Sequence, residues 1–69
     1  MMKYYYVNKN EQINGDHEVH TSDCNYLPKQ ENRIYLGYFS NCRDAVIEAK
    51  KYYRKSNGCY YCSRECHVS

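Results

Sequence analysis

The sequence has few of the residues that usually build a hydrophobic core. Its 69 residues include no tryptophan, one phenylalanine and only nine residues of the Val, Ile and Leu types. The hydrophobic fraction of 42% counts ten tyrosines and five cysteines, so it overstates the aliphatic content. Because a chain this short buries a small share of its surface, its core is expected to need a disulfide, a metal or a partner chain as further support.

The sequence also lacks a long apolar run. No stretch approaches the roughly 20 apolar residues that cross a bilayer, and the first segment, MMKYYYVNKN, lacks the apolar centre of a secretory signal. We therefore expect no membrane association and a cytoplasmic location. Cytoplasmic thiols are kept reduced, which favours metal or redox roles for the cysteines. Their odd number also argues against complete disulfide pairing.

Three segments, at residues 3–7, 17–20 and 34–39, have the aromatic and β-branched composition of strands. In the third, IYLGYF, simple alternation would place Ile34, Leu36 and Tyr38 on one face. Gly37 inside it indicates a bulge or a close backbone approach. The sequence thus predicts a short antiparallel sheet of about three strands.

One segment, residues 41–55, predicts the main helix. Ser40 or Asn41 can cap its start, and Asn57-Gly58 is expected to end it. Apolar residues recur in it at helical spacing and form one stripe: Cys42, Ala45, Val46, Ala49 and Tyr53. Together with the strands, this helix predicts a single small α+β domain over residues 1–69.

Two pairs of potential metal ligands lie on either side of the predicted third strand and helix. Cys59 and Cys62 have the C-x-x-C spacing that lets two thiolates bind one ion from a tight turn, or zinc knuckle. His20 and Cys24 form an H-x3-C pair upstream. Since a tetrahedral zinc site takes four nitrogen or sulfur ligands, the sequence predicts that one structural Zn²⁺ binds these four residues and stabilises the domain.

Other roles for the thiols stay open at this point. Cys66 and His67 lie close to the knuckle, and either could replace His20 as the fourth ligand. Cys42 lies on the apolar stripe and is expected to be a buried packing residue; with His20 as ligand, Cys66 is expected to pack as well. The C-x-x-C pair could instead be redox-active, although such pairs usually begin a helix in a βαβ unit.

Three segments carry a resemblance to a known family: HTSDCNYL, RIYLGYFSNCRDAVIEA and GCYYC. They resemble, in that order, the first ligand arm, the strand and helix, and the closing knuckle of the metal-binding domain of the Ada methylation-repair protein and of small Ada-like bacterial modules. The resemblance covers residues 17–67 and implies that His20, Cys24, Cys59 and Cys62 are zinc ligands. In the repair protein, the position of His20 is a cysteine that accepts a methyl group from DNA phosphotriesters. The resemblance therefore implies the fold and the metal without the repair reaction.

We expect a non-catalytic binding module, because four protein ligands leave no open position on zinc. Its partner would be a nucleic acid or a protein, and no small-molecule substrate is evident. Exposed tyrosines could stack on unpaired bases beside a basic edge made of Lys50, Lys51, Arg54, Lys55 and Arg64. The plainer interpretation is that these lysines are a solvated helix face and that the tyrosines fill the core. Two further alternatives are a zinc-bound Cys24 thiolate that accepts an alkyl group in DNA repair, and a disulfide or redox protein.

Overall fold

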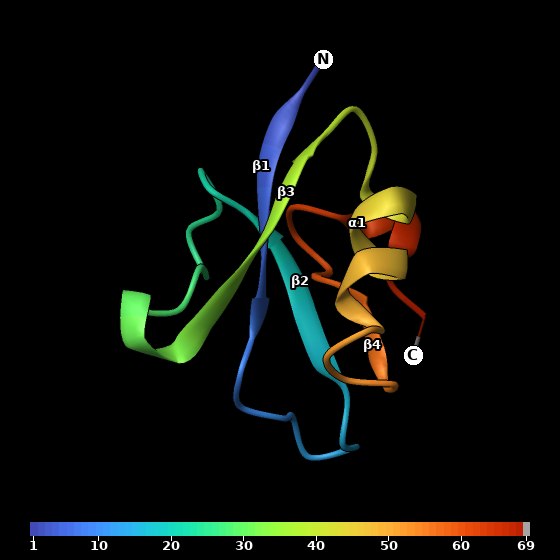
Figure 1. Cartoon of the computed structure of the whole chain (residues 1–69). Coiled ribbons are helices and arrows are strands. Elements are labelled where there is room, and N and C mark those ends of the chain that lie inside the picture. The colour runs from blue at the N-terminus through green and yellow to red at the C-terminus, as the bar shows by residue number, and fades with distance from the viewer. Residues whose placement is uncertain (69) are drawn as a thin grey trace.

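The chain forms a four-stranded mixed sheet with one helix packed across one face (Figure 1). The computed structural model describes residues 1–68. The strands are β1 (Lys3–Asn8), β2 (His17–Thr21), β3 (Arg33–Phe39) and β4 (Ser56–Gly58). Their order in the sheet is β3-β1-β2-β4, with β1 antiparallel to both β2 and β3, and β4 parallel to β2. The predicted α+β class is confirmed. The sheet differs from the expected three antiparallel strands, because it has a fourth strand, β4, that pairs in parallel with β2.

Strand β4 is the element that the sequence did not reveal. Its residues, Ser-Asn-Gly, are typical of turns, and Asn57-Gly58 was expected to end the helix. Instead, Ser56 pairs with His17, Gly58 pairs with Val19, and all three residues of β4 are buried. The contacts with β2 override the local preference for a turn, as sheet context often does.

Helix α1 (Cys42–Ala49) is shorter than the expected helix over 41–55. The side chain of Asn41 caps it by accepting the N–H of Asp44 at 2.9 Å. After Ala49 the chain must turn within a few residues to reach β4, so Lys50, Lys51, Arg54 and Lys55 lie beyond the helix. Within residues 1–68, no helix has the length and apolar character needed to cross a membrane.

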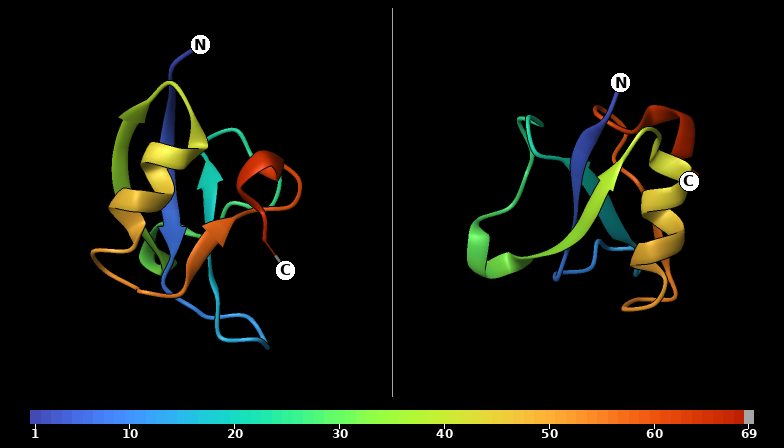
Figure 2. Two further views of the ribbon diagram at one scale, coloured as in Figure 1. Left: turned by 90° about the vertical axis from the view of Figure 1, so that its right-hand side faces the viewer. Right: turned by 45° about the horizontal axis from the view of Figure 1, so that its top comes forward.

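The core lies between α1 and the sheet (Figure 2) and contains Tyr5, Val7, Val19, Leu36, Cys42, Ala45 and Ala49. A bulge interrupts the pairing of β1 with β3, because Gly37 lies opposite Tyr5 while Tyr35 lies opposite Tyr6. The extra residue between them, Leu36, reverses the alternation that follows. Tyr38 is therefore exposed while Phe39 packs against the core, so the expected common face of Ile34, Leu36 and Tyr38 is wrong beyond the bulge.

A disulfide joins Cys42, at the start of α1, to Cys66 in the short 3-10 helix η2 (Arg64–Cys66). Cys42 is buried as expected, but the prediction that both cysteines only pack is wrong. Nothing in the spacing of two residues 24 apart indicates that their sulfurs meet. The odd number of cysteines is explained by one disulfide and three free thiols. Disulfides are typical of oxidising compartments, and this one therefore weighs against the expected cytoplasmic location. The location stays a prediction.

Candidate metal centre

The two ligand pairs predicted from the sequence meet at one end of the sheet. His20 lies in β2, and Cys59 directly follows β4. Because β2 and β4 are parallel neighbours, the residues at their carboxyl ends lie side by side. The N–H of Cys59 donates to the carbonyl oxygen of Val19 at 2.9 Å, which fixes this register. Cys24 and Cys62 come from the turns that follow each strand.

Short turns direct the second thiol of each pair back toward the first ligand. The N–H of Cys24 donates to the Thr21 carbonyl at 3.1 Å, and the N–H of Ser63 donates to the Cys59 carbonyl at 2.9 Å. Each free thiol also accepts one backbone N–H, and such donors stabilise the charge of a thiolate. The three bonds run from Tyr26 to Cys24 Sγ at 3.4 Å, from Tyr61 to Cys59 Sγ at 3.4 Å and from Thr21 to Cys62 Sγ at 3.3 Å.

The four predicted ligand atoms form one compact group. Nδ1 of His20 lies 3.5 Å from Cys24 Sγ and 3.9 Å from Cys62 Sγ, and Cys24 Sγ lies 3.9 Å from Cys59 Sγ. All four atoms lie within 4.8 Å of one another. A tetrahedral zinc ion would separate sulfur from nitrogen by about 3.6 Å and two sulfurs by about 3.8 Å, given its usual bond lengths. The three separations of 3.5 to 3.9 Å are close to these values, and the group as a whole is somewhat wider, so it could hold one metal ion after a small contraction.

The imidazole of His20 turns Nδ1 toward the thiols and Nε2 toward Glu18. The His20 side chain is 1% exposed, and its buried Nε2 has no hydrogen-bond partner within residues 1–68. Oε1 of Glu18 lies 3.6 Å away. A carboxylate near the remote nitrogen can keep the proton there and leave Nδ1 free for a metal. Glu18 was not predicted from the sequence, although its position two residues before His20 places both side chains on the same face of β2.

The three free thiols differ in acidity. Burial raises the pKa of Cys24 to about 12 and also raises the pKa of Cys59. Burial acts in the same direction on Cys62, but contacts with His20, with the Thr21 N–H and with two further groups outweigh it and lower the pKa of Cys62 to about 6. Without a metal near neutral pH, Cys62 is therefore mostly a thiolate while Cys24 and Cys59 hold their protons.

One side of the group faces a cavity of about 440 Å³. Cys24 and Cys62 are half-buried and line this cavity, whereas Cys59 is 1% exposed. The rings of Tyr26 and Tyr61, one from each ligand arm, stack 4.5 Å apart at the same cavity. Small molecules could therefore approach the group through Cys24 and Cys62.

The two alternative ligands lie outside the group. Cys66 is bonded to Cys42. His67 has its Nδ1 3.0 Å from the carbonyl oxygen of Gly58, and its ring packs edge-on against Tyr60. Neither residue belongs to the potential metal-binding group, which contains His20 instead.

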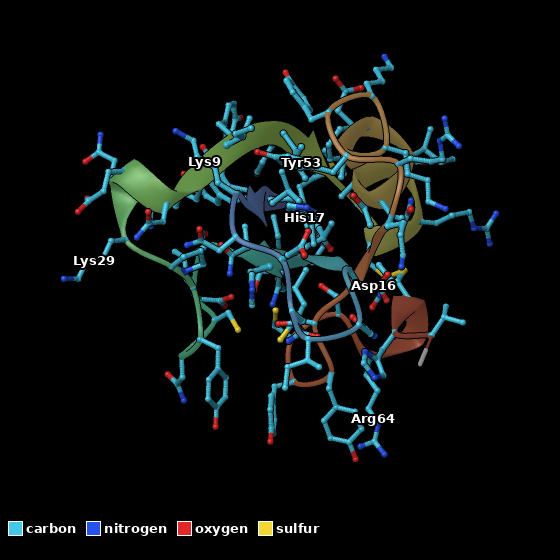
Figure 3. All side chains as sticks on the ribbon, turned by 90° about the horizontal axis from the view of Figure 1, so that it is seen from below. Lys9, Asp16, His17, Lys29, Tyr53 and Arg64 are labelled. Carbon is cyan, nitrogen blue, oxygen red and sulfur yellow. A yellow bond between two sulfur atoms is a disulfide. The ribbon has the colours of Figure 1, made fainter. Side chains whose placement is uncertain are left out.

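The residues of the predicted basic edge come from two parts of the chain, the segment that follows α1 and the 3-10 helix η2. Lys51 Nζ pairs with Glu48 at 3.0 Å near the end of α1. The guanidinium of Arg64 lies 4.4 Å from the centre of the Tyr60 ring. Figure 3 shows Arg64 on the opposite side of the molecule from Tyr53, which follows α1. Nucleic-acid binding by this set of basic residues stays a prediction.

Comparisons with known proteins give no relative for this chain. No protein-family model, no curated protein and no solved structure matches it. The relationship to the Ada metal-binding domain therefore depends on three short sequence segments and on the ligand spacing. It stays a prediction.

Proposed function

We propose that the chain is a zinc-binding module in which one Zn²⁺ joins the ends of β2 and β4. The observation that carries the proposal is the spacing of His20 Nδ1 and the three thiol sulfurs, which is close to that around one tetrahedral ion. Three thiolates and one imidazole form a donor set that binds zinc in preference to calcium, magnesium or manganese. We propose the same ligands as the Ada-like resemblance implies, within a single domain.

The metal would act mainly on stability. Structural zinc sites contribute apparent binding energies of about 10–16 kcal/mol, whereas the net stability of a folded domain is about 5–15 kcal/mol. The core contains two alanines and a cysteine and few large aliphatic side chains. A metal that joins two distant segments supplies the cohesion that such a core lacks. The partner bound by the stabilised domain would be a nucleic acid or a protein.

We propose that the module is not an enzyme, because four protein ligands fill a tetrahedral zinc ion and leave no position for water or substrate. One observation favours a competing function, alkyl transfer to a zinc-bound thiolate: Cys24 and Cys62 face the cavity. Such a transfer would form a new S–C bond while the leaving group departs with its bonding electrons. We expect no gain of a methyl group by mass spectrometry when the zinc-loaded protein is incubated with DNA that carries methyl phosphotriesters.

Elemental analysis of the purified protein tests the proposal. We expect one zinc per chain, and we expect Cys59→Ser to lose it, because this buried sulfur has no substitute nearby. The matched control is the double variant Cys42→Ser with Cys66→Ser, which replaces the two disulfide-bonded cysteines, changes no proposed ligand and should keep one zinc. Wild-type protein without bound metal, or equal zinc loss in both variants, would contradict the proposed site.

A further inference from the structure

Most of the tyrosines lie on the surface. Among the ten, Tyr5 alone is buried within the described chain, so the interpretation that tyrosines fill the core is wrong. Seven are at least 42% exposed. Exposed aromatic rings in this number are not required by packing, and contiguous apolar surface on a small domain often marks a binding site.

Four of the ten tyrosines, three of them exposed, share one face of the sheet. In β1, Tyr5 and Val7 point into the core beneath α1, so Tyr4 and Tyr6 point to the opposite face. Tyr38 lies opposite Tyr4 and Tyr35 lies opposite Tyr6, and directly paired residues share a face. We call Tyr4, Tyr6, Tyr35 and Tyr38 the tyrosine face. The left view of Figure 2 shows α1 in front of β1 and β3, on the side of the sheet away from this face.

The rings of the tyrosine face form a continuous row. The ring centres of Tyr38 and Tyr4 are 4.6 Å apart, those of Tyr4 and Tyr35 are 6.3 Å apart, and those of Tyr35 and Tyr6 are 5.4 Å apart. Tyr4, Tyr35 and Tyr38 are each about half exposed. The row therefore offers several adjacent aromatic surfaces to a flat ligand.

A cation, Arg33, lies at one end of the row. The guanidinium of Arg33 lies 4.6 Å from the centre of the Tyr6 ring, and its Nη1 donates to the Pro28 carbonyl at 3.1 Å. Within residues 1–68, no carboxylate lies within ion-pair distance of Arg33. The sequences of the two strands, KYYYVN and RIYLGYF, contain no acidic residue. An anionic ligand that lay along β1 and β3 could therefore bind the unpaired guanidinium of Arg33 and would meet no carboxylate from either strand.

We propose that the tyrosine face binds single-stranded nucleic acid, with bases stacked on the tyrosine rings and a phosphate held by Arg33. Stacking rings combined with a cation along a groove or sheet are the usual means of binding unpaired strands without sequence selection. Paired bases in a duplex cannot present their faces to such a row. The inference supplies the partner for the proposed function and rests on it, since the metal is expected to hold the sheet together.

Fluorescence anisotropy with labelled oligothymidylate and oligouridylate of about ten nucleotides tests this inference. We expect salt-sensitive binding to both strands and weaker binding to a duplex of equal length. Tyr35→Ala and Tyr38→Ala should each weaken binding about tenfold, whereas Tyr38→Phe should retain it because the ring remains. Arg33→Gln should reduce the slope of log affinity against log salt by about 0.7.

The matched control is Tyr52→Ala, because Tyr52 is 52% exposed, as is Tyr35, but lies beyond the end of α1. This variant should bind as the wild type does. The inference is overturned if zinc-loaded wild type binds neither strand, if it binds the duplex equally well, or if Tyr52→Ala loses as much affinity as Tyr35→Ala. Zinc content is measured on every sample. Absent zinc indicates failure of the proposed function, and unbound strands with zinc present indicate failure of this inference.

Discussion

At the scale of single residues, the five cysteines show how far spacing can be interpreted. The pairs His20 with Cys24 and Cys59 with Cys62 could be recognised because their members are close in sequence, and the structure brings both pairs together. The Cys42–Cys66 disulfide could not be recognised, because it depends on how α1 packs against η2. Residues that are close in sequence can be paired from their spacing alone, whereas a pairing between distant residues can be recognised only once the fold is known.

The unequal acidity of the thiols predicts the number of protons released on zinc binding. At pH 7, Cys24 and Cys59 must each lose a proton, because burial raises the pKa of both thiols, whereas Cys62, with a pKa of about 6, is already mostly ionised. We therefore expect the release of about two protons at pH 7. Below pH 6 the number should approach three, and zinc affinity should fall as the pH falls.

Isothermal titration calorimetry in buffers of different ionisation enthalpy measures this number directly. A release near three protons at pH 7 would mean that Cys62 is not acidic. A release that does not change between pH 7 and pH 5 would contradict the assignment of Cys62 as the ionised thiol.

At the scale of elements, the strands β1, β2 and β3 and the helix cap could be predicted from local pattern, because aromatic and β-branched runs and an Asn cap act over a few residues. Strand β4 could not, since it consists of three polar or small residues that become a strand only against β2. This missed pairing is what positions the metal centre. The sequence therefore predicts which four side chains come together better than it predicts the scaffold that brings them together.

Gly58, the last residue of β4, is where the scaffold is least tolerant of change. A Cβ at this position would lie 2.4 Å from the carbonyl oxygen of Ser63 and 2.8 Å from Cβ of Cys66. Since backbone cannot yield as a flexible side chain can, Gly58→Ala should displace the knuckle. We expect a loss of about 2 kcal/mol in unfolding free energy and faster zinc transfer to a competing chelator.

The control for this prediction is Gly15→Ala. Gly15 has a φ of +90°, and an added Cβ there would meet the flexible end of Lys55. This variant should also lose about 1 kcal/mol, through backbone strain, but its zinc transfer should match the wild type. Unchanged zinc transfer in Gly58→Ala would show that the close packing beneath the knuckle does not control the metal site.

At the scale of the whole molecule, the two cross-links have different tasks. The disulfide ties the start of α1 to η2, while the proposed metal ties β2 to the chain after β4. The double variant Cys42→Ser with Cys66→Ser should lose about 3 kcal/mol in unfolding free energy, as expected for a closed loop of this length. It should still bind one zinc. Chemical denaturation with and without a chelator separates the two contributions.

The account as a whole depends on one ion held by two distant segments of a chain with a small core. X-ray absorption at the zinc edge, on protein purified without chelator, tests this most directly. We predict a first shell of three sulfurs at about 2.3 Å and one nitrogen at about 2.0 Å. A shell with two or fewer sulfurs, or one dominated by oxygen and nitrogen, would contradict a site made of His20, Cys24, Cys59 and Cys62.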